Sequence, residues 1–357
     1  MKETLLLQAT DPVRDRQAIE TAAGLIRAGG LVAIPTETVY GLGANALDPQ
    51  AVTHIFEAKG RPQDNPLIIH ICEPEEAQQY ARDIPPVYYE LCRRFSPGPL
   101  TVILKKRDII PLETSGGLDT VAIRIPSHPI ARAIIREAGV PVAAPSANLS
   151  GKPSCTTAQH CVQDLWGRVD AIVDAGECDV GVESTVLSLA EEVPTLLRPG
   201  AVTPEQLRPV LGELRIHRAV TEKLEPGVRA TSPGMKYKHY APKAKVTLLE
   251  GSSEQYVRWV NAHQEEGAFA LCFDGDLPQV LLPAVSLGPD DLSQAHRLFA
   301  ALRRLDELGA RVVYAHCPSR EGVGLAVYNR LIRAAAYDER VLSEEETSTE
   351  PSEKGRN

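Results

Sequence analysis

The chain has 357 residues, 43% of them hydrophobic and 24% charged, and this length favours two domains over one. The formal net charge of −9 at pH 7 argues against a protein that binds nucleic acid over its whole surface, although a local basic cleft is compatible with it. Aromatic residues make up only 5% of the chain, so surfaces on which bases could stack are few.

The cysteines and the apolar segments indicate the compartment. The seven cysteines include no C-x-x-C pair, which excludes the usual zinc-binding spacings and fits thiols in a reducing cytosol. No basic segment followed by a long apolar core opens the chain, and no apolar run approaches the roughly 20 residues of a membrane helix. We therefore predict a cytoplasmic protein that does not interact with membranes.

The first part of the chain alternates predicted helices and strands. Apolar residues share one face of a helix over 17–28, and a strand follows over 31–35. Asp48 and Pro49 are typical of an N-cap and a first helical position, and Gly60 ends that second helix. Further strands are predicted over 67–71, 101–104, 121–125, 140–144 and 171–174, with helices over 129–138 and 157–166. Segments 185–189 and 195–198 favour a closing hairpin, and Thr203-Pro204 begins a last short helix.

The second part of the chain is separated from the first by a segment without periodicity. Prolines and glycines over 216–243 predict a linker. After it, strands over 245–249, 268–273 and 311–316 alternate with helices over 253–263, 293–308 and 323–335, a pattern typical of a small α/β unit with a parallel sheet. The expected organisation is a first domain over 1–215, the linker over 216–243, a C-terminal domain over 244–341 and a disordered tail over 342–357.

Two polar side chains interrupt predicted strands of the first domain. Arg124 opposes an apolar strand face, and His70 lies on the face opposite the odd positions of 67–71. A buried arginine needs an anionic partner, because an unpaired buried charge costs several kcal/mol. The residues leave open whether that partner is an internal carboxylate or a bound anion. For His70 alone, a structural histidine is the favoured interpretation.

Other polar clusters follow the predicted elements. Hydroxyls follow a strand in Pro35–Gly43, and two cations lie in a turn in Lys59-Gly60-Arg61-Pro62, which together predict a pocket for a small, polar, anionic ligand. Small and polar residues follow another strand over 143–148. The remaining clusters are Glu183-Ser184-Thr185 with Arg198, and the cationic and aromatic string over 235–242, which is either a solvated tether or a segment that folds over a ligand.

Several familiar motifs are absent. Gly151-Lys152 lacks the upstream glycine of a Walker loop, and neither G-x-S-x-G nor H-E-x-x-H occurs. The segment 41–46 matches a permissive dinucleotide fingerprint, but the next helix begins only at Asp48, and no acid follows about 20 residues later. We therefore assign no dinucleotide site there.

In their order and spacing these clusters resemble the threonylcarbamoyl-AMP synthase family, the YrdC/YwlC-like proteins. The resemblance runs from residue 15 to 210 and rests on Pro35–Gly43, Lys59–Pro62 with Asn65-Pro66-Leu67, Val121–Pro126 and Pro145–Asn148. The string 238–242 and the unit after it resemble the long form of the family. The resemblance implies an α/β fold: a YrdC-like catalytic domain with a twisted mixed sheet, plus a smaller Rossmann-like three-layer α/β C-terminal domain.

The resemblance also implies an activity and a set of site residues. Threonylcarbamoyl-AMP would be made from L-threonine, bicarbonate and ATP with release of pyrophosphate, as the first step of threonylcarbamoyl-adenosine (t6A) modification of tRNA. Threonine would bind to Thr38, His70, Arg124 and Ser184. ATP would bind to Lys59, Arg61, Asn65, Thr120, Ser146, Asn148, Ser154, Arg198 and Tyr240, the last reaching in from the linker as part of a lid.

The implied chemistry agrees with the residue types. Displacement at a phosphate needs alignment and charge neutralisation more than proton transfer, so no catalytic acid or base is assigned. Mg²⁺ is expected to enter with ATP, because no carboxylate cluster marks a dedicated metal site. Downstream threonylcarbamoyl-transfer proteins are the expected partners, and tRNA is a further candidate.

Two alternatives stay open at this point. The first is an RNA-binding module with no turnover, against which the acidic balance and the clustered cations argue. The second is a carbamoyl transferase of the hydrogenase-maturation type, whose paired C-x-x-C zinc fingers this chain does not contain.

Overall fold

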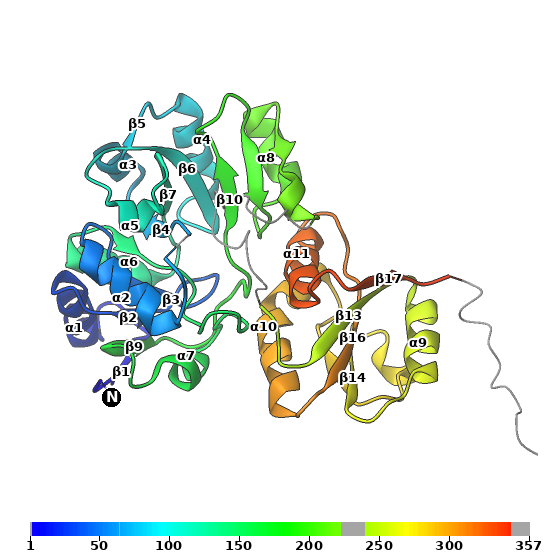
Figure 1. The fold of residues 1–357 in the computed structure, drawn as a ribbon. Helices are drawn as coiled ribbons and strands as arrows, with labels where there is room; N and C mark the ends of the chain where they lie inside the picture. Colours follow the sequence, from blue (N-terminus) through cyan, green and yellow to red (C-terminus); the bar gives the residue numbers. More distant parts are fainter. Residues whose placement is uncertain (1, 64, 223–239, 344–357) are drawn as a thin grey trace, which may run out of the picture.

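The structure is a computed structural model that describes residues 2–63, 65–222 and 240–343, and these form two α/β units (Figure 1). Twelve strands within the described residues form one mixed sheet in the first unit. Its path runs β1 (Leu5–Gln8), β9 (Ala171–Asp174), β2 (Val32–Ile34), β3 (Gly41–Asn45), β8 (Val142–Ala143), β4 (Ile68–His70), β7 (Thr120–Arg124), β6 (Leu100–Lys106), β10 (Thr185–Ser188), β11 (Thr195–Arg198) and β12 (Arg215–Ile216), with β5 (Ala81–Arg82) paired to β6.

The helices of the first unit begin and end where local chemistry favours it. In α2 (Pro49–Lys59) the Asp48 carboxylate accepts hydrogen bonds from two backbone N–H groups of the first turn, and Gly60 ends the helix at φ +61°. The other helices are α1 (Arg16–Arg27), α3 (Ala77–Tyr80), α4 (Pro86–Phe95), α5 (Leu112–Ser115), α6 (Pro129–Ala138), α7 (Ala158–Leu165) and α8 (Pro204–Leu211), with short 3₁₀ turns η1 (Pro74–Glu76) and η2 (Arg218–Val220).

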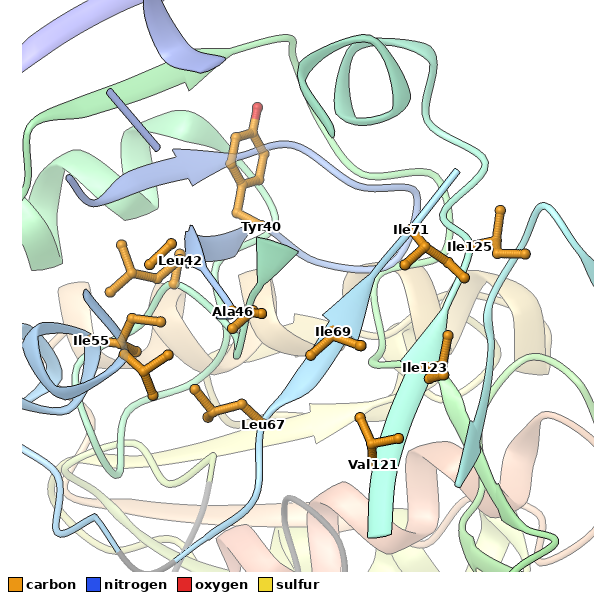
Figure 2. Packing of buried hydrophobic residues seen from close by; sticks show 14 of the residues in the cluster. Tyr40, Leu42, Ala46, Ile55, Leu67, Ile69, Ile71, Val121, Ile123 and Ile125 are labelled. Carbon is orange, nitrogen blue, oxygen red and sulfur yellow. The ribbon is translucent and has the colours of Figure 1, made fainter. Parts of the chain in front are cut away.

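The core of the first unit explains which side chains are left for a site. The odd residues of β4 and β7 and their flanks, among them Ile69 and Ile123, pack with Leu42 and Ile55 in one buried cluster (Figure 2). Because side chains alternate along a strand, His70 and Arg124 lie on the other face of the same sheet, paired side by side in the β4–β7 register. The alternation read from the sequence is therefore confirmed.

The second unit has three layers. Its five parallel strands run in the order β15 (Ala284–Ser286), β14 (Ala268–Cys272), β16 (Val312–His316), β13 (Lys245–Glu250) and β17 (Glu339–Val341). Helix α9 (Ser253–Ala262) covers one face, while α10 (Asp291–Glu307) and α11 (Gly324–Ala334) cover the other and lie next to the first unit (Figure 1). A 3₁₀ turn, η3 (Leu277–Gln279), follows β14.

Some elements differ from those expected. Strand β3 falls on 41–45, a segment for which no strand was predicted. A Cβ at Gly43 would lie 3.0 Å from Val142 Cγ1 and 3.2 Å from the Val32 carbonyl oxygen, so glycine lets the neighbouring strands approach. Strand β12 and η2 extend into 216–220, so the expectation that structure lapses from 216 is wrong there. The rest of the expected linker over 223–239 and the expected tail over 344–357 lie outside the described residues. None of the described helices is long and apolar enough to cross a membrane.

Candidate functional site

The polar clusters of the first unit meet around one cavity, which the second unit adjoins. Its walls come from the loop between β2 and β3, the end of α2, the ends of β4 and β7, the loop after β8, and the start of β10 with the end of β11. The lining residues are Thr36, Thr38, Val39, Gly41, Lys59, Arg61, Ile68, His70, Arg124, Ala144, Pro145, Ser146, Asn148, Ser150, Gly151, Glu183, Ser184, Arg198 and Tyr240.

Most residues expected at the site line this cavity. The structure brings ten of them together there: Thr38, Lys59, Arg61, His70, Arg124, Ser146, Asn148, Ser184, Arg198 and Tyr240. Three do not line it. Asn65 and Ser154 are fully buried behind the wall, and Thr120 lies at the opposite end of β7 from Arg124.

Arg124 has an internal anionic partner. Its Nη2 lies 2.8 Å from Glu37 Oε1, and both side chains are nearly inaccessible to solvent. The second oxygen of Glu37 accepts a hydrogen bond from the Ser127 backbone N–H at 3.2 Å. The two charged groups approach closely but are not aligned as a hydrogen bond, and Arg124 Nε has no hydrogen-bond partner among the described residues. The guanidinium therefore retains donors that a second anion could engage.

Next to Arg124 the His70 imidazole is neutral. Its Nδ1 lies 3.2 Å from the Val142 carbonyl oxygen, which can only accept, so the proton is assigned to Nδ1 and Nε2 carries a lone pair. Burial, and then the charge of Arg124, lower the pKa of His70 to about 3. This corner of the cavity therefore has one fixed positive charge and one neutral hydrogen-bonding group.

Hydroxyls and a second arginine continue the wall from β6 to β11. Ser184 Oγ lies 2.7 Å from Thr101 Oγ1 and accepts from Arg198 Nη2 at 3.2 Å, while Arg198 Nε donates to the Ser184 carbonyl oxygen at 3.0 Å. Burial lowers the pKa of Arg198 to about 10, so the group remains a cation at neutral pH.

Lys59 fastens the loop after β8 to the end of α2. Its ammonium donates to the carbonyl oxygens of Ser146 and, at 2.6 Å, of Asn148. The Asn148 amide donates in turn to the carbonyls of Leu149 and Lys152, which leaves its Oδ1 without a hydrogen-bond partner in the described structure. Burial, and then repulsion from Arg61, lower the pKa of Lys59 to about 7.

Glu183 also lines the cavity. The sequence places it in a polar cluster, but no ligand was assigned to it. It accepts a hydrogen bond from Ser154 Oγ at 2.5 Å and pairs with Arg330 Nε of the second unit at 3.0 Å. Burial raises the pKa of this carboxyl, but the charges of Arg330 and Arg198 and the Ser154 hydroxyl outweigh it, so the pKa lies below its ordinary value. Glu37 was missed as well, and its only sequence signal is its place between Thr36 and Thr38.

Tyr240 closes the cavity from the side of the second unit. Its ring lies 5.3 Å from the Phe299 ring on α10 and is buried, and its backbone has φ +64°. The next residue, Ala241, donates its N–H to the Gly151 carbonyl oxygen at 3.0 Å. Of the string that predicted a lid, only 240–242 lie within the described residues.

The charge of the lining suits an anionic ligand. Three lining arginines are cationic (Arg61, Arg124 and Arg198), and Lys59, with a pKa of about 7, is a cation when protonated. The one carboxylate among the lining residues, Glu183, is already paired with an arginine. Within the described residues no three His, Cys, Asp or Glu side chains gather as metal ligands. The charges of the lining therefore suit a polyanion, and Arg124 with His70 suits a smaller polar anion.

Comparisons with known proteins cover both units. The family model Sua5_yciO_yrdC, described as "Telomere recombination", matches residues 24–200, and "Threonylcarbamoyl-AMP synthase, C-terminal domain" matches residues 202–336. The chain is similar to the threonylcarbamoyl-AMP synthases of Pyrococcus abyssi (47% identical, 94% of this chain and 98% of the relative) and Bacillus subtilis (45%, 89% and 92%). It also resembles the crystal structure of P. abyssi Sua5 complexed with L-threonine, with a TM-score of 0.88 and 44% identity over 95% of this chain and 99% of that one.

Proposed function

Because this chain belongs to the Sua5/YrdC family of threonylcarbamoyl-AMP synthases, we propose that it condenses L-threonine, bicarbonate and ATP to threonylcarbamoyl-AMP and pyrophosphate. This makes it a nucleotidyltransferase that performs the first step of t6A modification of tRNA. The relatives that match nearly the whole chain carry the synthase name, which disfavours a plain RNA-binding module.

One structural observation carries the proposal. A single cavity joins a corner with Arg124 and neutral His70 to a wall with Lys59, Arg61 and Arg198. The first corner suits the carboxylate of an amino acid, and the second suits the phosphates of a nucleotide. Two different anions can thus be held side by side, as a condensation between them requires.

The proposed chemistry has two steps. The threonine amine attacks the carbon of bicarbonate and forms a carbamate with loss of water; if CO₂ derived from bicarbonate is attacked instead, the amine loses a proton and no water leaves in that step. An oxygen of that carbamate attacks the α-phosphorus of ATP, and the bond to the bridging oxygen breaks, so that pyrophosphate leaves with the electron pair. The cations neutralise charge that accumulates on the phosphates, and the buried walls keep water from the mixed anhydride.

The roles proposed for the residues follow their positions. Threonine binds to Thr38, His70, Arg124 and Ser184, with its carboxylate on the free donors of Arg124. Lys59, Arg61, Ser146, Asn148, Arg198 and Tyr240 contact ATP directly. Ser154, whose hydroxyl donates to the lining residue Glu183, supports those contacts from behind the wall. Asn65 and Thr120 are proposed beside the nucleotide and lie outside the lining.

Mg²⁺ is proposed to arrive bound to the phosphates of ATP. The lining carboxylate Glu183 pairs with Arg330, and Glu37, outside the lining, pairs with Arg124, so among the described residues the cavity presents few oxygen ligands of its own. The ion would neutralise phosphate charge, as it does in other phosphoryl-transfer sites.

We also propose that the protein works in the cytoplasm and passes its product to threonylcarbamoyl-transfer proteins acting on tRNA. All seven cysteines are free thiols, which fits a reducing compartment. A mixed anhydride hydrolyses in water, so a consuming enzyme must follow closely.

The experiment that tests the function is pyrophosphate release from ATP with and without L-threonine and bicarbonate. Release that requires both supports the synthase. Release indifferent to threonine, or none, contradicts it, and RNA binding with a steep dependence on salt would then favour the binding module.

A further inference from the structure

We propose that the second unit takes part in nucleotide binding through two positioning residues, Arg303 on α10 and Arg330 on α11, which hold Ser154 and the loop 148–154 in place. This inference rests on the proposed function and deepens it, because it assigns a task to a unit whose role the sequence leaves open. Neither arginine lines the cavity. Both act across the junction between the units, on groups directly behind its wall.

Arg303 holds the backbone of the loop. Its Nη2 donates to the Pro153 carbonyl oxygen at 2.6 Å and pairs with Asp164 Oδ2 at 2.9 Å, and its Nε lies 3.4 Å from the Ser154 carbonyl oxygen. Asp164 is inaccessible to solvent and also accepts from the Leu149 backbone N–H and from the Lys152 ammonium. The buried ion pair between Arg303 and Asp164 therefore connects α10 with α7 and with both ends of the loop 148–154.

Arg330 holds the same loop from its other side. Its side chain is completely buried, and it donates to Glu183 Oε2 at 3.0 Å, to the Glu183 carbonyl oxygen at 3.1 Å and to the Pro199 carbonyl oxygen at 2.5 Å. The other oxygen of Glu183 accepts from Ser154 Oγ. Pro199 directly follows Arg198, so Arg330 fixes the backbone beside a cation of the cavity as well.

The two networks converge on Ser154. Its carbonyl faces Arg303, and its hydroxyl is held by Glu183, which Arg330 orients. The other end of the loop is held by Lys59 through the Asn148 carbonyl, and Asn148 lines the cavity. Loss of either arginine would therefore release the nucleotide side of the cavity. Arg124 and His70 lie on the sheet of the first unit and are held there by strand pairing instead.

The junction offers a matched control on the same helix. Arg333 is also buried and also donates across the junction, but its partner is the Ala219 carbonyl oxygen at 2.6 Å, in η2. It touches neither Ser154 nor Glu183 in the described structure. A variant at Arg333 thus weakens the docking of the two units without acting on the loop.

The test compares R330Q, R303Q and R333Q in the full chain, by the KM for ATP, the KM for threonine and the melting temperature. We expect R330Q and R303Q to raise the KM for ATP about tenfold, as displacement of a positioned group commonly does. R303Q should leave the KM for threonine within about twofold, whereas R330Q also raises it, because the Glu183 carbonyl that Arg330 holds belongs to the peptide bond to Ser184. R333Q should lower the melting temperature and leave both KM values within about twofold. R330K, which keeps the charge but not the forked contact, should fall between wild type and R330Q and serves if R330Q does not fold.

A double variant separates positioning through Ser154 from an independent effect. The part of the R330Q effect that passes through Glu183 and Ser154 is lost in an S154A background, so R330Q should raise the KM for ATP by a smaller factor there than in wild type. The proposal is overturned if the two effects multiply in full, if R333Q matches R330Q, or if the KM for threonine in R303Q rises as much as that for ATP. Should wild type release no threonine-dependent pyrophosphate, the proposed function fails. Titration calorimetry of ATP on the same variants then decides the inference by itself.

Discussion

Removal of the Arg124 charge should separate threonine binding from ATP binding. Arg124 and Glu37 are about 95% buried and 2.8 Å apart, so Arg124→Ala alone would leave an unpaired buried carboxylate, which costs about 3–5 kcal/mol of stability. The informative variant is therefore R124M/E37Q, which removes both charges and keeps the side-chain volumes similar. Its glutamine retains an acceptor for the Ser127 N–H.

The expected magnitude follows from the contact that is lost. A hydrogen bond to a charged group contributes about 1.5–3 kcal/mol, so the affinity for threonine should fall about 10- to 100-fold. Titration calorimetry should show this loss for R124M/E37Q together with an unchanged affinity for ATP. E37Q alone keeps the guanidinium and should retain threonine binding, and urea unfolding should confirm that both variants fold. The assignment of Arg124 is refuted if threonine affinity is unchanged, or if ATP affinity falls equally.

Three further predictions concern protonation and the second unit. Since burial and Arg61 lower the pKa of Lys59 to about 7, bound phosphates should draw a proton onto it, so that ATP affinity falls as pH rises from 7 to 9. Calorimetry in two buffers of different ionisation enthalpy should detect this proton uptake, and an equal uptake in K59M would contradict it. Because the pKa of His70 is lowered to about 3, it stays neutral, and threonine affinity should be flat between pH 5.5 and 7.5; a rise towards pH 5.5 would mean that His70 becomes charged. Truncation after Glu222 removes Arg303, Arg330 and Tyr240 together and should lower pyrophosphate release at least about tenfold, whereas full activity in a folded truncation would make the second unit dispensable.

Capping residues and the alternation of side chains along a strand were sufficient to predict the elements that neighbouring residues determine. Asp48 and Gly60 bound α2 as expected, because capping needs only neighbouring backbone groups. Alternation along β4 and β7 placed His70 and Arg124 on the face opposite the core, because a strand has only two faces. Strand β3 was not predicted. Its glycines allow the neighbouring strands to approach closely, and this requirement becomes visible only in the folded sheet.

The pairings behind the cavity could not be predicted from the sequence. Glu37 and Arg124 lie far apart in the chain, and either an internal carboxylate or a bound anion would satisfy the same pattern of burial. The burial of Arg303 and Arg330 is harder to predict, because the sequence alone indicates that an arginine on a helix of the second unit lies on an exposed face. Only the docking of α10 and α11 against the first unit shows that these two side chains are buried and face Asp164 and Glu183.

The two sides of the cavity therefore depend on different parts of the fold. Arg124 and His70 sit on paired strands of the first sheet, whose geometry needs no help from the second unit. The loop with Asn148 and Ser154 is held by side chains of α10 and α11, and Tyr240 packs on Phe299 of α10. On the proposed function, nucleotide positioning and closure over a water-sensitive anhydride thus share one junction. Displacement of Arg303, Arg330 and Tyr240 would weaken ATP binding and admit water at the same time, while Arg124 and His70 keep their places on the sheet.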